Sequence, residues 1–527
     1  MAVRPKSINP VTRWSGLAAL LFVALLVAGP LIALWLRADT SSILTSADWS
    51  AVRFTLFQAT LSASISVVLA IPVARALARR SFWGRSALIT FLGSPFLLPV
   101  IVAIFGLLAI WGRSGLISQL LQSAGADRLS IYGLSGVLLA HVFFNLPLVT
   151  RLVLQGWGHI PVEHFRLSAQ LGMSSKDVFL RLELPMLRSI LPGAFLLVFL
   201  LSVTSFAVAL TLGGGPKATT IELAIYQALR FEFDLGKAAV LGLVQFVICA
   251  IIAFWSLRAA VPVTFGGGLS AVTKRWDVSS KRMILQDGVV LVAVTVFLGA
   301  PLFAVIRRGL PSLANLPTTI WPAIINSLTV ALTSALFSVL LALALAGFID
   351  TLKSRHKKMS SIVEAIGLLT LAASPFVLGT GLFIIIHPIA DPFALALPVT
   401  ALVNAAISLP LALRALLPAL QQNRENYGRL TDSLDMRGWS RFRLTTWPAI
   451  RKPLGFSTGL AAALSMGDLG VITLFAPPDV ETLPLVMYRL MGAYRMDEAA
   501  SVALILVALT LTLFWIFDRG GRLGHQT

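Results

Sequence analysis

The sequence is a series of long apolar runs joined by short polar segments. A helix needs roughly 20 apolar residues to cross a bilayer, and the chain has about twelve runs of that size. They lie at residues 15–36, 54–77, 87–111, 132–155, 190–212, 238–257, 287–306, 323–349, 362–387, 393–418, 454–475 and 499–517. Of the 527 residues, 57% are hydrophobic and 12% are charged, whereas soluble domains average about 25% charged residues. This composition excludes an ordinary soluble enzyme and a disordered chain. It predicts an all-α polytopic membrane protein with about twelve transmembrane helices.

Basic residues outnumber acidic ones. The chain carries 42 Lys and Arg against 23 Asp and Glu, for a net charge of +19. Lys and Arg gather in alternate connections between the runs, for example at 75–85, 274–282 and 353–358. Cytoplasmic loops of membrane proteins have this distribution, so it does not indicate nucleic-acid binding. We expect a multi-pass protein in contact with membrane lipid, with both termini in the cytoplasm and no nucleic-acid partner.

Two polar segments repeat half a chain apart. Residues 166–191 and 429–454 align without a gap. The identical pairs are Arg166/Arg429, Leu167/Leu430, Leu171/Leu434, Met173/Met436, Phe179/Phe442, Pro185/Pro448, Arg188/Arg451 and Leu191/Leu454. Shared apolar composition does not explain identities in polar loops, so we expect two fused six-helix halves in the same orientation. Transporters commonly place the substrate path between such halves.

The repeat sets the predicted domain boundaries. Residues 1–50 are an N-terminal tail with the first transmembrane helix, and residues 51–258 are the first half. A linker containing the seventh transmembrane helix covers 259–320. The second half covers 321–518, and a cytoplasmic tail covers 519–527.

The repeated segments resemble the EAA loop of ABC-importer permeases. Each places a pivot residue, Gly172 or Asp435, and a later proline at the family's spacing. The sequence departs from the family in three places. The family's Glu-Ala-Ala is replaced by Arg-Leu-Ser in the first loop and by Arg-Leu-Thr in the second. Asp435 replaces the family's glycine in the second loop, and Trp447 occupies a position where the family usually has leucine. The resemblance implies that these loops dock into a separate ATPase. Candidate coupling residues are Arg166, Gly172, Met173, Phe179, Leu184, Pro185, Arg429, Asp435, Met436, Trp439, Phe442, Trp447 and Pro448.

Three further stretches narrow the resemblance. They are GGGPKATTIELAIYQALRFEFD from Gly213, SMGDLGVITLF from Ser465 and LPLVMYRLMGAYRMDEAA from Leu483. All three resemble thiamine ABC importer permeases and, more distantly, ferric-iron permeases. The resemblance implies two fused type I ABC permease halves in the bacterial inner membrane. It also implies two copies of a cytoplasmic ATPase, a periplasmic substrate-binding protein, and thiamine with its phosphates as the small-molecule substrate.

The sequence contains no motif for ATP hydrolysis. No G-x-x-x-x-G-K-[ST] phosphate loop occurs, and no metal-ligand spacing or nucleophile–base pair is evident. We expect no enzymatic activity and no bound cofactor, with ATP on the partner subunit. Two alternatives remain: the same architecture carrying ferric iron or another small solute, and a secondary transporter driven by an ion gradient.

Six side chains in or near the predicted spans are candidates for the substrate path: Asp468, Ser205, His141, Asn145, Tyr226 and Tyr488. Charges within a bilayer are costly and usually face a cavity or a partner. Asp468 therefore either attracts a cationic substrate or is satisfied by backbone groups freed by neighbouring glycines. Ser205 takes its place in the first copy. His141 and Asn145 share a helix face and either line the path or bond between helices. The tyrosines either face a cation or form an interfacial aromatic belt.

Overall fold

The described part of the chain is helical. The computed structural model describes residues 10–38, 44–215, 218–259, 280–314, 316, 320–353, 356–371, 373–436, 438–477 and 480–522, and these residues hold no strand. By length and composition, 11 helical segments can cross a membrane, and one further apolar helix is shorter. The prediction of an all-α polytopic protein with about twelve spans is thus confirmed. Parts of the predicted N-terminal segment 1–50, linker 259–320 and tail 519–527 lie outside the described residues, namely 1–9, 39–43, 260–279, 315, 317–319 and 523–527.

The helices lie on both sides of the predicted linker and within it. Before the linker they are α1 (Pro10–Arg37), α2 (Ser46–Arg79), α3 (Arg85–Phe91), α4 (Val100–Trp111), α5 (Leu116–Ser123), α6 (Leu134–Gly158), α7 (Val162–Gln170), α8 (Ser175–Val178), α9 (Leu184–Val203), α10 (Phe206–Leu212), α11 (Ile221–Gln227) and α12 (Leu235–Arg258). The linker contains α13 (Lys281–Ser312), and the helices that follow are α14 (Ile320–Lys353), α15 (Lys357–Leu368), α16 (Pro375–Ile386), α17 (Ala396–Ser433), α18 (Gly438–Arg441), α19 (Trp447–Met466), α20 (Gly470–Phe475), α21 (Leu483–Gly492) and α22 (Met496–Arg522).

The helix that precedes each half packs on the other half. α1 contacts α14 and α16, whereas α13 contacts α2 and α4 as well as α22. Glycines allow the close approach: Gly106 of α4 lies against Pro301, and Gly381 of α16 lies against Pro30. In both places a Cβ atom would overlap the proline backbone. α1 and α13 therefore join the two halves, because each packs on the half that it does not precede.

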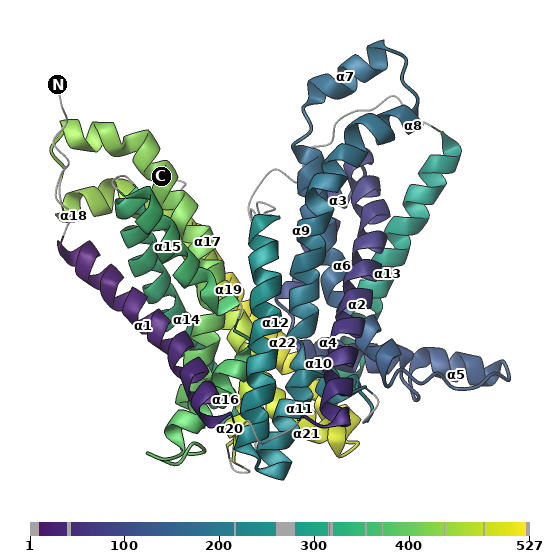
Figure 1. The fold of residues 1–527 in the computed structure, drawn as a ribbon. Coiled ribbons are helices and arrows are strands. Elements are labelled where there is room, and N and C mark those ends of the chain that lie inside the picture. Colours follow the sequence, from purple (N-terminus) through teal and green to yellow (C-terminus); the bar gives the residue numbers. More distant parts are fainter. Residues whose placement is uncertain are drawn as a thin grey trace.

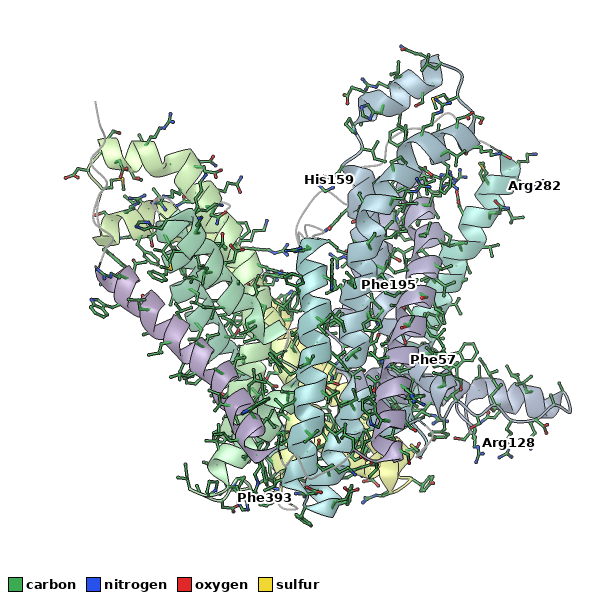
Figure 2. All side chains as sticks on the ribbon, in the orientation of Figure 1. Phe57, Arg128, His159, Phe195, Arg282 and Phe393 are labelled. Atoms are coloured by element: carbon green, nitrogen blue, oxygen red, sulfur yellow. The ribbon has the colours of Figure 1, made fainter. Side chains whose placement is uncertain are left out.

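Two groups of helices diverge toward one end of the molecule. One group contains α1, α14, α15 and α17, and the other contains α2, α6, α9 and α13 (Figure 1). They separate toward the end that carries α7 and α18, and they meet near α11 and α21 (Figure 1). Figure 2 places Arg282 toward the diverging end, and Phe393 and Arg128 toward the other. We call these the loop end and the closed end.

Two predicted spans are interrupted. Within 87–111, α3 is followed by a 3₁₀ turn at Ser94–Phe96 before α4 begins. Within 362–387, α15 is followed by a 3₁₀ turn at Leu369–Leu371 before α16 begins. A Ser-Pro-Phe sequence lies at each interruption, and proline both lacks an N–H and disfavours helix at the residue before it. α16 has only 12 residues, so the structure replaces the expected continuous ninth span with shorter helices.

The repeat is visible in hydrogen bonds between helices. The Ile221 amide at the start of α11 donates to the Thr55 hydroxyl of α2, at 2.9 Å. The Leu483 amide at the start of α21 donates to the Ser327 hydroxyl of α14, at 2.8 Å. Each bond satisfies one of the helix-start amides that no intrahelical carbonyl can reach. The two halves therefore share this contact between corresponding helices.

Candidate functional site

The pivot of each repeated loop has a left-handed backbone. Gly172 has φ +64° and Asp435 has φ +47°. Glycine adopts this conformation without strain, and aspartate is one of the few other residues that tolerate it. The next amides donate to matching carbonyls: Met173 to Ser168 at 3.0 Å, and Met436 to Thr431 at 2.9 Å. Replacement of the family's glycine by Asp435 therefore leaves the loop geometry intact.

The same loops share a wide helical turn before their transmembrane helices. Residues Phe179–Glu183 and Phe442–Thr446 each form one π-helical turn. α9 and α19 follow directly, and each has its proline in the first turn. Proline is tolerated there because the first-turn amides have no helical partner. The repeated proline spacing thus marks the same junction of loop and membrane helix in both halves.

The two loops are held by different contacts. In the first, the fully buried Glu183 carboxylate pairs with Arg75 of α2 at 2.7 Å and with Arg79 at 3.9 Å. The Arg75 guanidinium also lies 4.6 Å from the centre of the Phe179 ring. The second loop instead has an aromatic stack, in which the Trp439 and Phe442 ring centres are 5.3 Å apart. The first loop is therefore anchored to α2 by charge, and the second contains its own apolar cluster.

Exposed leucines repeat on the two loops. Leu167 and Leu171 are 54% and 67% exposed, and their counterparts Leu430 and Leu434 are 53% and 63% exposed. In each loop the two lie four residues apart, and therefore on one helix face. Our sequence interpretation missed this pair as a surface, although its spacing within the repeat was a usable signal. We call these four residues the leucine pairs.

The predicted coupling residues lie around the leucine pairs. Their side chains are either exposed or half-buried, and none is enclosed in the core. The exposed ones are Arg166, Gly172, Pro185, Arg429, Asp435, Trp439, Phe442, Trp447 and Pro448, and the half-buried ones are Met173, Phe179, Leu184 and Met436. Trp439 is the most exposed aromatic side chain among them, at 72%. Their docking role remains a prediction.

The candidate path residues of α6 form bonds between helices. The His141 Nδ1 atom lies 2.9 Å from the Ser62 hydroxyl of α2, and the Asn145 amide donates to the Ser202 hydroxyl of α9 at 3.3 Å. Both side chains are buried. In the second half, Asn404 donates in the same way to Ser465, at 3.1 Å. These bonds match the interhelical role that the sequence left open for His141 and Asn145.

Asp468 lies in a break between two helices. α19 ends at Met466 and α20 begins at Gly470, and the Gly470 amide donates to Asp468 Oδ1 at 3.1 Å. Ser205 occupies the matching break between α9 and α10. The Oδ2 atom of Asp468 is buried and has no hydrogen-bond partner among the described residues. Oδ1 thus has the backbone partner expected if neighbouring backbone groups stabilise the buried acid. Oδ2 has none, which is compatible with a role in the substrate path.

The two candidate tyrosines meet at one cavity. Tyr226 of α11 and Tyr488 of α21 both line a cavity of about 440 Å³ at the closed end. They occupy matching positions in the two halves, so both halves contribute to the cavity, although most of its lining residues belong to the first half. Asp48, Glu232 and Lys237 line it as well. Glu232 and Lys237 are five residues apart, whereas Asp48 lies almost 190 residues earlier on α2, and no sequence signal connected it to them. Among the described residues, no group of three or more His, Cys, Asp or Glu side chains is placed to hold a metal ion.

Comparison with known proteins identifies the family. No family model matches the sequence. The thiamine transport system permease protein of Escherichia coli (strain K12) is 38% identical over 98% of this chain and 98% of its own length. The corresponding protein of Brucella abortus (strain 2308) is 39% identical over 98% of this chain and 97% of its own length. The chain belongs to the thiamine transport permease family.

A shorter relative agrees with the repeat. The molybdenum transport system permease protein of Mycobacterium bovis is 29% identical over 46% of this chain and 91% of its own length. A whole permease subunit therefore matches about half of this thiamine-permease family member. This is the relation expected where two permease halves are fused. The relatives are transport permease subunits, and the apolar helices indicate a multi-pass inner-membrane protein.

Proposed function

We propose that this chain supplies both halves of the membrane permease of an ABC importer that carries thiamine and its phosphates into the cell. The observation that supports this most strongly is the pair of matching loops at the loop end. Each has a left-handed pivot, a π-helical turn and an exposed leucine pair. The relatives named for thiamine transport match the chain over nearly its full length, which supports the cargo.

In this proposal two copies of a cytoplasmic ATPase dock on the loops, one beneath each half. Exposed apolar side chains on otherwise polar loops suit a protein partner, because burying them removes apolar surface from water. ATP is bound and hydrolysed on the partner, and this chain binds no cofactor. A periplasmic binding protein delivers the substrate at the closed end. Closure of the ATPase pair moves the loops and, through α9 and α19, the two halves.

The orientation follows from docking. The start of α1 lies beside the end of α14, where Gly347 approaches Thr12, and the end of α22 lies beside the start of α19, where Gly521 approaches Arg451. α14 and α19 have these ends on the loop side of the molecule. If the ATPase binds from the cytoplasm, both ends of the described chain therefore face the cytoplasm. This agrees with the distribution of basic residues.

The test is co-purification of the ATPase combined with thiamine uptake. Leu171→Gln with Leu434→Gln removes one leucine from each pair, and we expect loss of both ATPase binding and uptake. Leu395→Gln is the matched control, because Leu395 is exposed at 37% and lies outside both loops. Retention of ATPase binding by the double variant would contradict docking at the loops. Uptake that proceeds without the ATPase and collapses with a protonophore would instead identify an ion-coupled transporter.

A further inference from the structure

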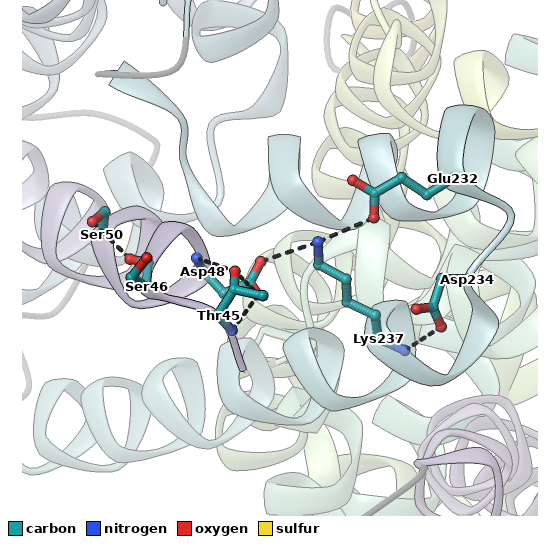
Figure 3. Close-up of polar contacts among 7 residues, drawn as sticks. All are labelled: Thr45, Ser46, Asp48, Ser50, Glu232, Asp234 and Lys237. Atoms are coloured by element: carbon teal, nitrogen blue, oxygen red, sulfur yellow. Dashed lines mark hydrogen bonds and ion pairs between the residues drawn. The ribbon is translucent and has the colours of Figure 1, made fainter. Parts of the chain in front are cut away.

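The closed-end cavity has an ionic wall. Lys237 Nζ lies 3.0 Å from Glu232 Oε2 and 3.4 Å from Asp48 Oδ1 (Figure 3). Asp48 is fixed in turn by Thr45, whose hydroxyl donates to Asp48 Oδ2 at 2.6 Å and whose amide donates at 2.8 Å. Two carboxylates and one ammonium leave a net charge of about −1 on this wall at neutral pH. The wall therefore favours a cation in the cavity.

Aromatic rings form the adjoining wall and continue inward. The Phe231 ring is 68% exposed and meets Tyr226 edge to face, with centres 5.7 Å apart. Tyr226 meets Phe206 in the same way at 5.4 Å. Phe206 packs against Phe376 of the other half, with centres 4.0 Å apart. Both inner rings are buried. The cavity thus has aromatic walls, and rings from both halves lie between it and the interior.

We infer that this cavity is an outer binding site for a flat heteroaromatic cation, the chemical class of the cargo. The inference rests on the proposed function for its ligand. A volume of about 440 Å³ lies within the range of small-molecule sites. Aromatic faces attract cations through their quadrupole, and the ionic wall adds a negative charge. Because Tyr226 and Tyr488 come from different halves, movement of the halves reshapes the site.

The site can be tested by protecting a cysteine with thiamine. The sole cysteine, Cys249, is fully buried, so it contributes little background labelling. Gln227→Cys places a thiol on the cavity lining. Gln122→Cys is the control, because Gln122 is exposed on α5, away from the cavity. In nanodiscs containing the full chain, without ATPase or binding protein, we expect thiamine to slow maleimide labelling at residue 227 but not at residue 122.

Two charge variants distinguish a specific effect on thiamine binding in the cavity from the effect of removing any nearby carboxylate. Glu232→Gln removes one carboxylate from the cavity wall, and we expect the thiamine concentration for half-protection to rise about fivefold or more. Asp234→Asn is the matched control. Asp234 does not line the cavity, and its carboxylate accepts a bond from the Lys237 amide at 2.9 Å (Figure 3), which asparagine can replace. Equal effects of the two variants, or no protection in either background, would overturn the inference.

Uptake by the same variants distinguishes this inference from the proposed function. ATPase-dependent thiamine uptake without protection at residue 227 would overturn the cavity assignment and leave the proposed function standing. Protection without uptake would support the cavity as a binding site and contradict the importer. Protection at residue 227 that Glu232→Gln weakens and Asp234→Asn preserves, with uptake present, would support both.

Discussion

Substitution of Gly172 by alanine tests how far ATPase docking depends on loop geometry. Gly172 has φ +64°, and no atom lies within 4 Å of the Cβ that alanine would add. The cost is therefore conformational and not steric, roughly 1–2 kcal/mol for an L-residue in the left-handed region. A penalty of that size shifts an equilibrium by about 5–30-fold. If the loop must hold this conformation to bind the ATPase, affinity falls by up to that factor.

The assay is titration of the purified ATPase against the chain in nanodiscs. Gly158→Ala is the matched control. Gly158 lies at the end of α6, also has open space around it, and has no left-handed backbone. We expect Gly172→Ala to weaken ATPase binding about 5–30-fold and Gly158→Ala to leave it within about twofold, because alanine is the better helix former. Unchanged affinity for Gly172→Ala, or an equal loss in both variants, would refute the reasoning.

Three other predictions concern anchoring, docking and folding. Glu183→Gln leaves Arg75 without its buried charge partner, so thermal melting should show a loss of about 3 kcal/mol; an unchanged melting temperature would contradict the anchor. Trp439→Ala removes the stack on Phe442 and should lower stability by about 0.5–1.5 kcal/mol, yet weaken ATPase binding about tenfold, as truncation of an interface aromatic does. Thr55→Val leaves the Ile221 amide unpaired, and denaturation should show a loss of about 1–3 kcal/mol.

Periodicity and repetition were strong enough in the sequence to predict the helical fold and the loop pair. Apolar runs reveal membrane helices because a helix must be long enough and apolar enough to cross the bilayer. Identical residues in polar loops revealed the duplication, since composition alone does not produce them. Hydropathy, however, does not register where a run is interrupted. Ser94–Phe96 and Leu369–Leu371 are too short to break an apolar run in a hydropathy profile, although the backbone leaves the α-helix there.

The candidate site was less accessible to sequence reasoning. Asp48 and Lys237 meet because the starts of α2 and α12 come close together at the closed end, and no spacing rule connects them. The leucine pairs could be recognised as a surface only from the exposure of their side chains, which the sequence does not show. Tyr226 and Tyr488 could be paired through the repeat, but their shared cavity required the fold. Local geometry was therefore predictable where the repeat constrained it, and contacts between distant helices were not.

The central claim is tested most directly by uptake of labelled thiamine into proteoliposomes. The vesicles contain this chain with or without its ATPase, and binding protein and ATP are supplied on the appropriate sides. Our account predicts accumulation only when chain, ATPase and hydrolysable ATP are all present. Accumulation that needs no ATPase, or a complete assembly that hydrolyses ATP but accumulates no thiamine, would contradict it.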